Sequence, residues 1–185
     1  MSFVHAHFIT YARDLGYPAL VAAGVFSLIG GSALIGALFL GRLSDRRGRR
    51  VWLGISYHLR TMGFVVVLLS MGVPWVGIPP LGFAPLLIGV LLVGFSWNAV
   101  VSITAAYASD RFGIAKLGAI YGTMFAVMPV GSGLGAYLGG LLYDYRGTYD
   151  WAIWSNILLL LVSAILVFSI REPRRPAALG VAAAD

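Results

Sequence analysis

The chain has 185 residues, 59% of them hydrophobic and only 11% charged, whereas a soluble domain has about 25% charged residues. This composition argues against a soluble domain, because too few polar side chains remain to cover its surface. We therefore expect the apolar surface of the protein to face membrane lipid. The net charge of +6 does not indicate a nucleic-acid partner, because the basic residues form short clusters between long uncharged runs. The chain has no cysteine, which excludes a thiolate nucleophile and a Cys-based metal site.

Uncharged runs long enough to cross a bilayer follow one another along the chain. A crossing needs about 20 mostly apolar residues, because a helix rises about 1.5 Å per residue and the hydrocarbon core is about 30 Å thick. Prolines between residues 74 and 85 divide the longest run into two crossings. The expected spans are residues 17–40, 51–72, 84–108, 117–142 and 151–170. The predicted fold is all-α, a polytopic membrane helix bundle.

The two ends of the chain are interpreted separately. Residues 1–14 are apolar but cover only about half a bilayer, and they lack the basic start and cleavage site of a signal peptide. We interpret them as an N-terminal half-helix that precedes the five full transmembrane helices. Residues 173–185 are rich in proline and alanine, so we expect a disordered cytoplasmic tail after one membrane domain, residues 1–172.

Arginine and lysine concentrate on one side of the expected bundle. That side holds the loops at residues 41–50 and 109–116 and the tail, whereas the opposite side has only Arg13 and Arg146. Because basic loops stay in the cytoplasm, we expect the arginine-rich side and the C-terminus to be cytoplasmic. The high usage of arginine, alanine and glycine is typical of a GC-rich bacterial genome, which predicts a bacterial inner membrane.

The most specific motif is GRLSDRRGRR at residues 41–50, between the first two expected spans. Glycine permits a tight reversal at the membrane surface. An Asp45 carboxylate can pair with a neighbouring arginine or with a helix N-terminus, in a contact that forms in one packing only and so can latch a conformation. The alternative is that the arginines only set topology and bind anionic headgroups.

This motif resembles the cytoplasmic signature of the major facilitator superfamily, between the second and third helices of each six-helix half. The matching positions are Gly41, Leu43, Asp45, Arg46, Gly48, Arg49 and Arg50. On that family's frame the five spans resemble helices eight to twelve, and residues 1–14 the end of helix seven. The resemblance implies the C-terminal half of a transporter truncated at its N-terminus, with a missing N-terminal half or a partner subunit.

Small residues recur at helical spacing in two spans. Gly131, Gly135 and Gly139 leave one face of the fourth span as bare backbone, which predicts close helix packing. The first span has a similar stripe at Ala23, Ser27 and Gly31. The glycine-rich stretch resembles the eleventh helix of the family, although Ala136 stands where a proline would be expected, and residues 140–149 resemble its outer end in monocarboxylate-transporter-like members.

Polar side chains within the spans are the candidates for binding a solute, because they are costly in lipid. Arg60 lies about 15 Å from the cytoplasmic arginines and could bind an anion or form a structural pair. His7 could bind a carboxylate or relay protons, or lie at the interface. Trp97, Asn98 and Ser102 lie in mid-span, where Asn98 needs a hydrogen-bond partner from a helix, water or solute.

These features predict a secondary transporter that carries a small organic anion, such as a monocarboxylate, coupled to protons by alternating access. The alternative is a small oligomerising or inactive half-transporter, because alternating access requires two halves. An intramembrane protease built on Ser132 fits poorly, since Val130 stands where its motif needs glycine. We expect the lipid bilayer and a small-molecule solute as partners, and neither a cofactor nor a metal, because the three histidines lack neighbouring ligands.

Overall fold

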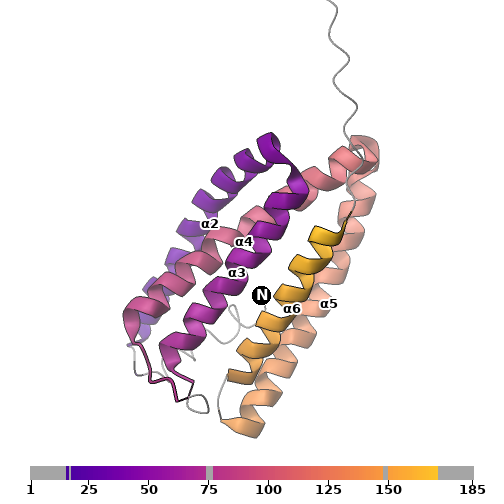
Figure 1. Cartoon of the computed structure of the whole chain (residues 1–185). Coiled ribbons are helices and arrows are strands. Elements are labelled where there is room, and N and C mark those ends of the chain that lie inside the picture. The colour runs from indigo at the N-terminus through magenta and orange to yellow at the C-terminus, as the bar shows by residue number, and fades with distance from the viewer. Residues whose placement is uncertain (1–15, 17, 74–76, 148–149, 171–185) are drawn as a thin grey trace, which may run out of the picture.

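The computed structural model describes residues 16, 18–73, 77–147 and 150–170, and within them the chain folds as five long helices (Figure 1). The helices are α2 (Ala19–Arg47), α3 (Arg49–Met71), α4 (Phe83–Phe112), α5 (Ile114–Arg146) and α6 (Asp150–Ser169). Each is long and apolar enough to cross a membrane. The prediction of an all-α, multi-pass membrane bundle with five crossings is confirmed, whereas the half-helix and the tail lie outside the described residues.

The helices are longer at the basic end of the bundle than the hydropathy pattern predicts. The prediction of a loop at residues 41–50 is wrong, because α2 continues to Arg47 and α3 begins at Arg49. Arginine and leucine favour helix, so the helices extend beyond the apolar spans into the polar boundary. Gly48, with φ 99°, is the only residue between α2 and α3, and Gly113, with φ 81°, is the only one between α4 and α5. Positive φ favours glycine, which explains where both helices end.

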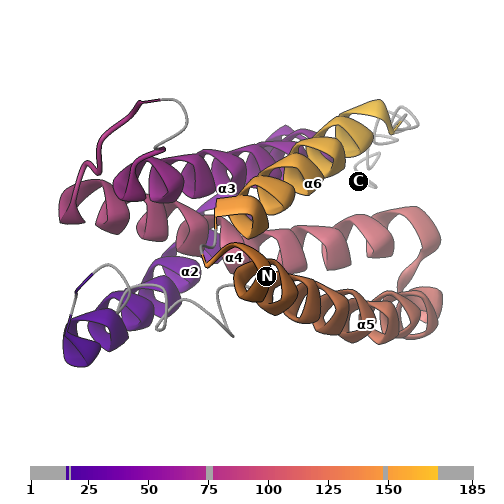
Figure 2. The same cartoon turned by 90° about the horizontal axis from the view of Figure 1, so that it is seen from below.

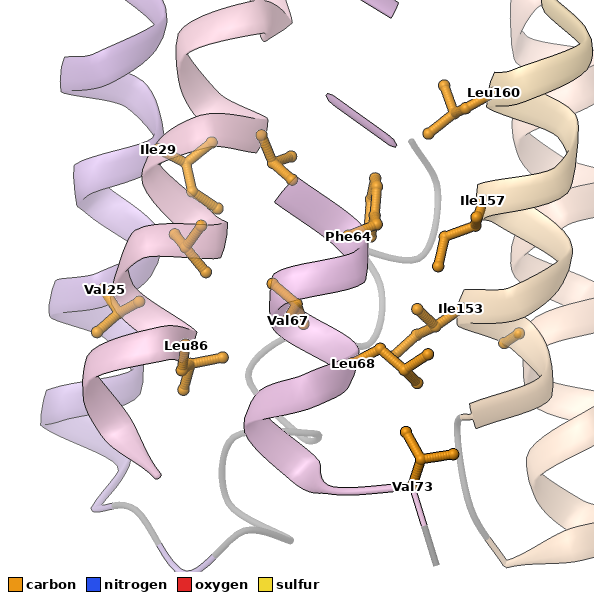
Figure 3. Close-up of a cluster of buried hydrophobic side chains, with 13 residues drawn as sticks. Val25, Ile29, Phe64, Val67, Leu68, Val73, Leu86, Ile153, Ile157 and Leu160 are labelled. Atoms are coloured by element: carbon orange, nitrogen blue, oxygen red, sulfur yellow. The ribbon is translucent and has the colours of Figure 1, made fainter. Parts of the chain in front are cut away.

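Helix α4 is the centre of the packing. It packs most extensively against α3 and α2, while α6 packs against α3 (Figures 1 and 2). Figure 3 shows the main core, in which α2, α3, α4 and α6 all contribute apolar side chains. Its buried members are Val25, Ile29, Phe64, Val67, Leu68, Val73, Leu86, Val90, Val93, Ala152, Ile153, Ile157 and Leu160. The buried helical residues of this core therefore come from four helices, whereas α5 packs against it through the partly buried Leu142 and Tyr143.

Glycines let α4 approach its neighbours at backbone distance. A Cβ added to Gly36 of α2 would lie 1.7 Å from the carbonyl oxygen of Phe95, and one added to Gly63 of α3 would lie 2.9 Å from the carbonyl oxygen of Gly89. A Cβ on Gly94 would in turn lie 2.8 Å from the carbonyl oxygen of Ile29. None of these three distances leaves room for a side chain, so the main chain of α4 lies close to the main chain of both neighbours.

Candidate functional site

The basic motif folds around one arginine. The Nη1 of Arg49, in the first turn of α3, donates a hydrogen bond to Asp45 Oδ1 at 2.6 Å across the α2–α3 turn. Its Nε donates to Asp110 in the last turn of α4. One guanidinium thus joins the ends of three helices at the same end of the bundle, the upper end in Figure 1.

The other residues of the motif differ in their contacts and exposure. Arg50 donates a hydrogen bond to the carbonyl oxygen of Ile170, just after the end of α6. Arg46 is exposed. Gly41 lies within α2, about two turns before the reversal, where its carbonyl oxygen accepts a hydrogen bond from Ser44 Oγ at 2.7 Å. Only Gly48 therefore supplies the tight turn, because the chain reverses within one residue. The latch role of these residues stays a prediction.

A second polar cluster lies where α3 and α4 cross, around Arg60. Arg60 is 3% exposed. Its Nη2 donates hydrogen bonds to the main-chain carbonyl oxygens of Ser96 at 2.8 Å and Trp97 at 3.1 Å, and its Nε lies 3.4 Å from Ser96 Oγ. The Cζ atom lies 5.6 Å from the centre of the Trp97 ring, within the range of a cation–π interaction.

Arg60 has no carboxylate partner among the described residues. The ion pairs found there both belong to Arg49. Carbonyl oxygens and an aromatic face therefore replace part of the hydration that the guanidinium loses on burial. They leave its positive charge uncompensated beside the middle of α4.

Asn98 and Ser102 lie one turn apart on an exposed face of α4. The Ser102 Oγ donates a hydrogen bond to the carbonyl oxygen of Asn98 at 3.0 Å. Trp97 is half-buried, and its main-chain carbonyl faces Arg60. The structure thus places Arg60 and Trp97 in contact, whereas Asn98 and Ser102 face away from the core.

Tyr121 of α5 also hydrogen-bonds to the main chain of α4. Its hydroxyl donates to the carbonyl oxygen of Val101 at 3.1 Å, and its ring lies 4.7 Å from that of Phe125 between centroids. Neither Tyr121 nor Asp110 is among the candidates that the sequence indicates. Spacing offers no signal for them, because each acts on a residue in another helix.

The two small-residue stripes face outward in the described part of the chain. Gly139 is buried, but Gly131 and Gly135 are exposed, and a Cβ added to Gly131 would have no neighbour within 4 Å. In α2 the stripe of Ala23, Ser27 and Gly31 is exposed, and the opposite face is buried. Close packing on these stripes stays a prediction, because it needs a helix beyond those described.

The remaining candidates concern residues 1–15 and metal binding. His7 lies outside the described residues, so its role in binding a carboxylate or relaying protons stays a prediction. Among the residues that the structure describes, no group of three or more histidine or acidic side chains could hold a metal ion.

Comparisons with known proteins agree on one family. A model described as "Major Facilitator Superfamily" matches residues 2–184. The chain is 28% identical over 169 residues to an uncharacterized MFS-type transporter, YcxA of Bacillus subtilis (strain 168), a match that covers 91% of the chain and 38% of that protein. It is 27% identical over 165 residues to a protein of Mycolicibacterium hassiacum named as a triacylglyceride transporter, covering 88% of the chain and 29% of that protein. The chain therefore spans well under half the length of both relatives.

Proposed function

The chain belongs to the major facilitator superfamily, and from this membership we propose that it is the C-terminal half of a secondary transporter that carries a small organic anion with protons. The family and the transporter names of the relatives indicate transport rather than catalysis. Alternating access needs two halves around one site. The proposed partner is an N-terminal half or a second subunit, in keeping with the relatives' greater length.

The observation that carries the anion proposal is the uncompensated charge of Arg60. A buried guanidinium without a carboxylate creates a positive potential in its surroundings, because the low dielectric of the membrane screens it weakly. The exposed Asn98 side chain follows directly after Trp97, whose carbonyl oxygen binds that guanidinium. A carboxylate solute would find amide N–H donors at Asn98, and the Ser102 hydroxyl would turn from the Asn98 carbonyl oxygen to donate to the solute. The positive charge of Arg60 would add a favourable potential.

Uptake assays test the solute class. The chain, extended upstream to the full length of its relatives, is reconstituted in proteoliposomes and offered a monocarboxylate, a neutral sugar, a cationic drug or a triacylglyceride. The last solute is included because the Mycolicibacterium relative is named for it. We expect uptake of the monocarboxylate, driven by a proton gradient. Uptake of any other solute without that of the carboxylate would reject the anion proposal.

A pair of serine variants tests the site. Ser102 is exposed and Ser163 is half-buried, and each donates a hydrogen bond to the carbonyl oxygen four residues earlier in its helix. We expect Ser102→Ala to raise the KM for the carboxylate about two- to tenfold, the effect of one lost hydrogen bond. Ser163→Ala, on α6, should leave the KM unchanged. Equal KM values for Ser102→Ala and the parent would remove Ser102 from the solute site.

A further inference from the structure

Side chains from two neighbouring helices hydrogen-bond to the main chain in the middle of α4. Arg60 of α3 binds the carbonyl oxygens of Ser96 and Trp97, and Tyr121 of α5 binds that of Val101. Asn98 lies between these three carbonyl groups in the sequence, on the exposed face. Carbonyl oxygens inside a helix already accept hydrogen bonds from residues four positions later, so these contacts are additional to those that form the helix.

Side-chain packing and hydrogen bonds both act on the rotation of α4. Near Gly63 and Gly89 the side chains of Val93 and Val67 pack into the space that these glycines leave, whereas the segment around Asn98 is also held by the hydrogen bonds to its main chain. A helix turns by about 100° for each residue, so a small rotation of α4 would move Asn98 away from its exposed face. Hydrogen bonds to named carbonyl oxygens oppose such a rotation, because they depend on direction.

We propose that Arg60 and Tyr121 are positioning residues that hold the central turn of α4 and thereby keep Asn98 and Ser102 on the face that meets the solute. This inference rests on the proposed function in one respect, that this face lines the solute path. It assigns Arg60 an indirect role, in which the guanidinium binds main-chain oxygens while its charge acts on the solute at a distance. It adds Tyr121, which no sequence motif indicates.

The natural absence of cysteine makes a direct test possible. Single cysteines replace Asn98, Ser102 and Ile88, the last as an exposed reference position about 15 Å along α4 from Asn98. Each is combined with Arg60→Met or Tyr121→Phe. Tyr137→Phe is the matched control, because Tyr137 lies on the same helix as Tyr121, is 68% exposed, and its hydroxyl has no hydrogen bond with a described residue. The rate of labelling by N-ethylmaleimide is measured in membranes without solute.

We expect Tyr121→Phe and Arg60→Met to change the labelling rates at positions 98 and 102 by about threefold or more, as the loss of a hydrogen bond that restrains the helix would do. The rate at position 88 should stay within about twofold of the parent, and Tyr137→Phe should leave all three rates unchanged. Tyr121→Phe keeps the ring and its contact with Phe125. This variant therefore still tests the proposal if the Arg60 variant does not accumulate in the membrane.

Three results would overturn the proposal. The first is unchanged labelling at positions 98 and 102 in variants that accumulate normally. The second is an equal change at position 88, which would show general loosening, and the third is no labelling at either site in the parent protein. Labelling needs no transported solute, so a failure of the solute assignment in uptake assays leaves this result interpretable and the two proposals fail separately.

Discussion

Two arginines of α3 keep their charges in contrasting environments. Arg49 lies at the end of the helix with two carboxylate partners, whose side chains are 61% exposed at Asp45 and 44% exposed at Asp110. Arg60, three turns further along, is buried and binds only carbonyl oxygens and an aromatic ring. Partly exposed ion pairs contribute about 0–1 kcal/mol each, so Arg49 matters for the geometry of three helix ends more than for stability.

The variant Arg49→Met tests this distinction. It removes both ion pairs, so we expect the free energy of unfolding in detergent to fall by about 1 kcal/mol or less. The transport rate of the full-length protein should fall several-fold, because the ends of α2 and α4 lose their common partner. Arg42→Met, an exposed arginine on α2 outside the network, serves as the control and should change neither quantity. Transport at the parent rate in Arg49→Met would contradict the latch.

Helix contacts in this protein depend on single glycines that sit where two backbones meet. Gly36 allows α2 to touch Phe95, and Gly63 and Gly89 face each other across α3 and α4. The regular stripes in α2 and α5 predict close packing, yet a Cβ added to their glycines at positions 31 and 131 would have no neighbour within 4 Å. A glycine matters for packing when its own helix face is buried, which periodicity along one helix does not reveal.

Two glycine-to-alanine changes in α2 separate these cases. In Gly36→Ala the new Cβ would overlap the main chain of Phe95, which no side-chain rotation can relieve, so α2 must move away from α4. We expect this to lower the free energy of unfolding by about 1–3 kcal/mol. Gly31→Ala, with open space at the Cβ, should be neutral or stabilising by up to about 1 kcal/mol, because alanine favours helix. Denaturation in mixed detergent, followed by circular dichroism, measures both.

A loss in Gly31→Ala equal to that in Gly36→Ala would show that the effect does not come from the α2–α4 contact. A stable Gly36→Ala protein would contradict the close crossing seen here.

At the scale of the whole molecule, packing is uneven across the bundle. α2, α3, α4 and α6 supply the buried helical residues of one core, whereas α5 buries only Gly139 among its described residues. The ends of the bundle are also unequal, since the α2–α3 and α4–α5 turns bring the basic motif, Arg111 and Lys116 to one end. This charge asymmetry predicts that the basic end lies in the cytoplasm.

Cysteine labelling in whole cells tests the orientation. Phe112→Cys, at the basic end, and Leu81→Cys, at the other end, replace side chains that are 52% and 53% exposed. We expect a membrane-impermeant maleimide to label position 81 in intact cells and position 112 only after permeabilisation, because arginine-rich ends are retained in the cytoplasm. The reverse pattern would show that the charges do not set the topology.

Much of the architecture was predictable from local features. The number and approximate limits of the crossings follow from hydropathy, because each helix must match the thickness of the bilayer whatever its neighbours are. The motif at residues 41–50 indicated the family, and its Asp45–Arg49 contact could be anticipated from proximity in the chain. The extent of α2 and α3 at their shared end could not, because helices continue past the apolar region wherever the backbone hydrogen bonds can form.

The sequence by itself therefore determined the membrane-spanning helices that the structure describes, the family and the places where charge is concentrated. Only the tertiary structure decided which distant residues meet, such as Arg49 with Asp110, Tyr121 with Val101 and Gly36 with Phe95. It also decided that Arg60 binds the main chain of α4. The reason is physical: crossing a membrane constrains each helix separately, whereas these contacts depend on how helices rotate and pack against one another, which hydropathy does not encode.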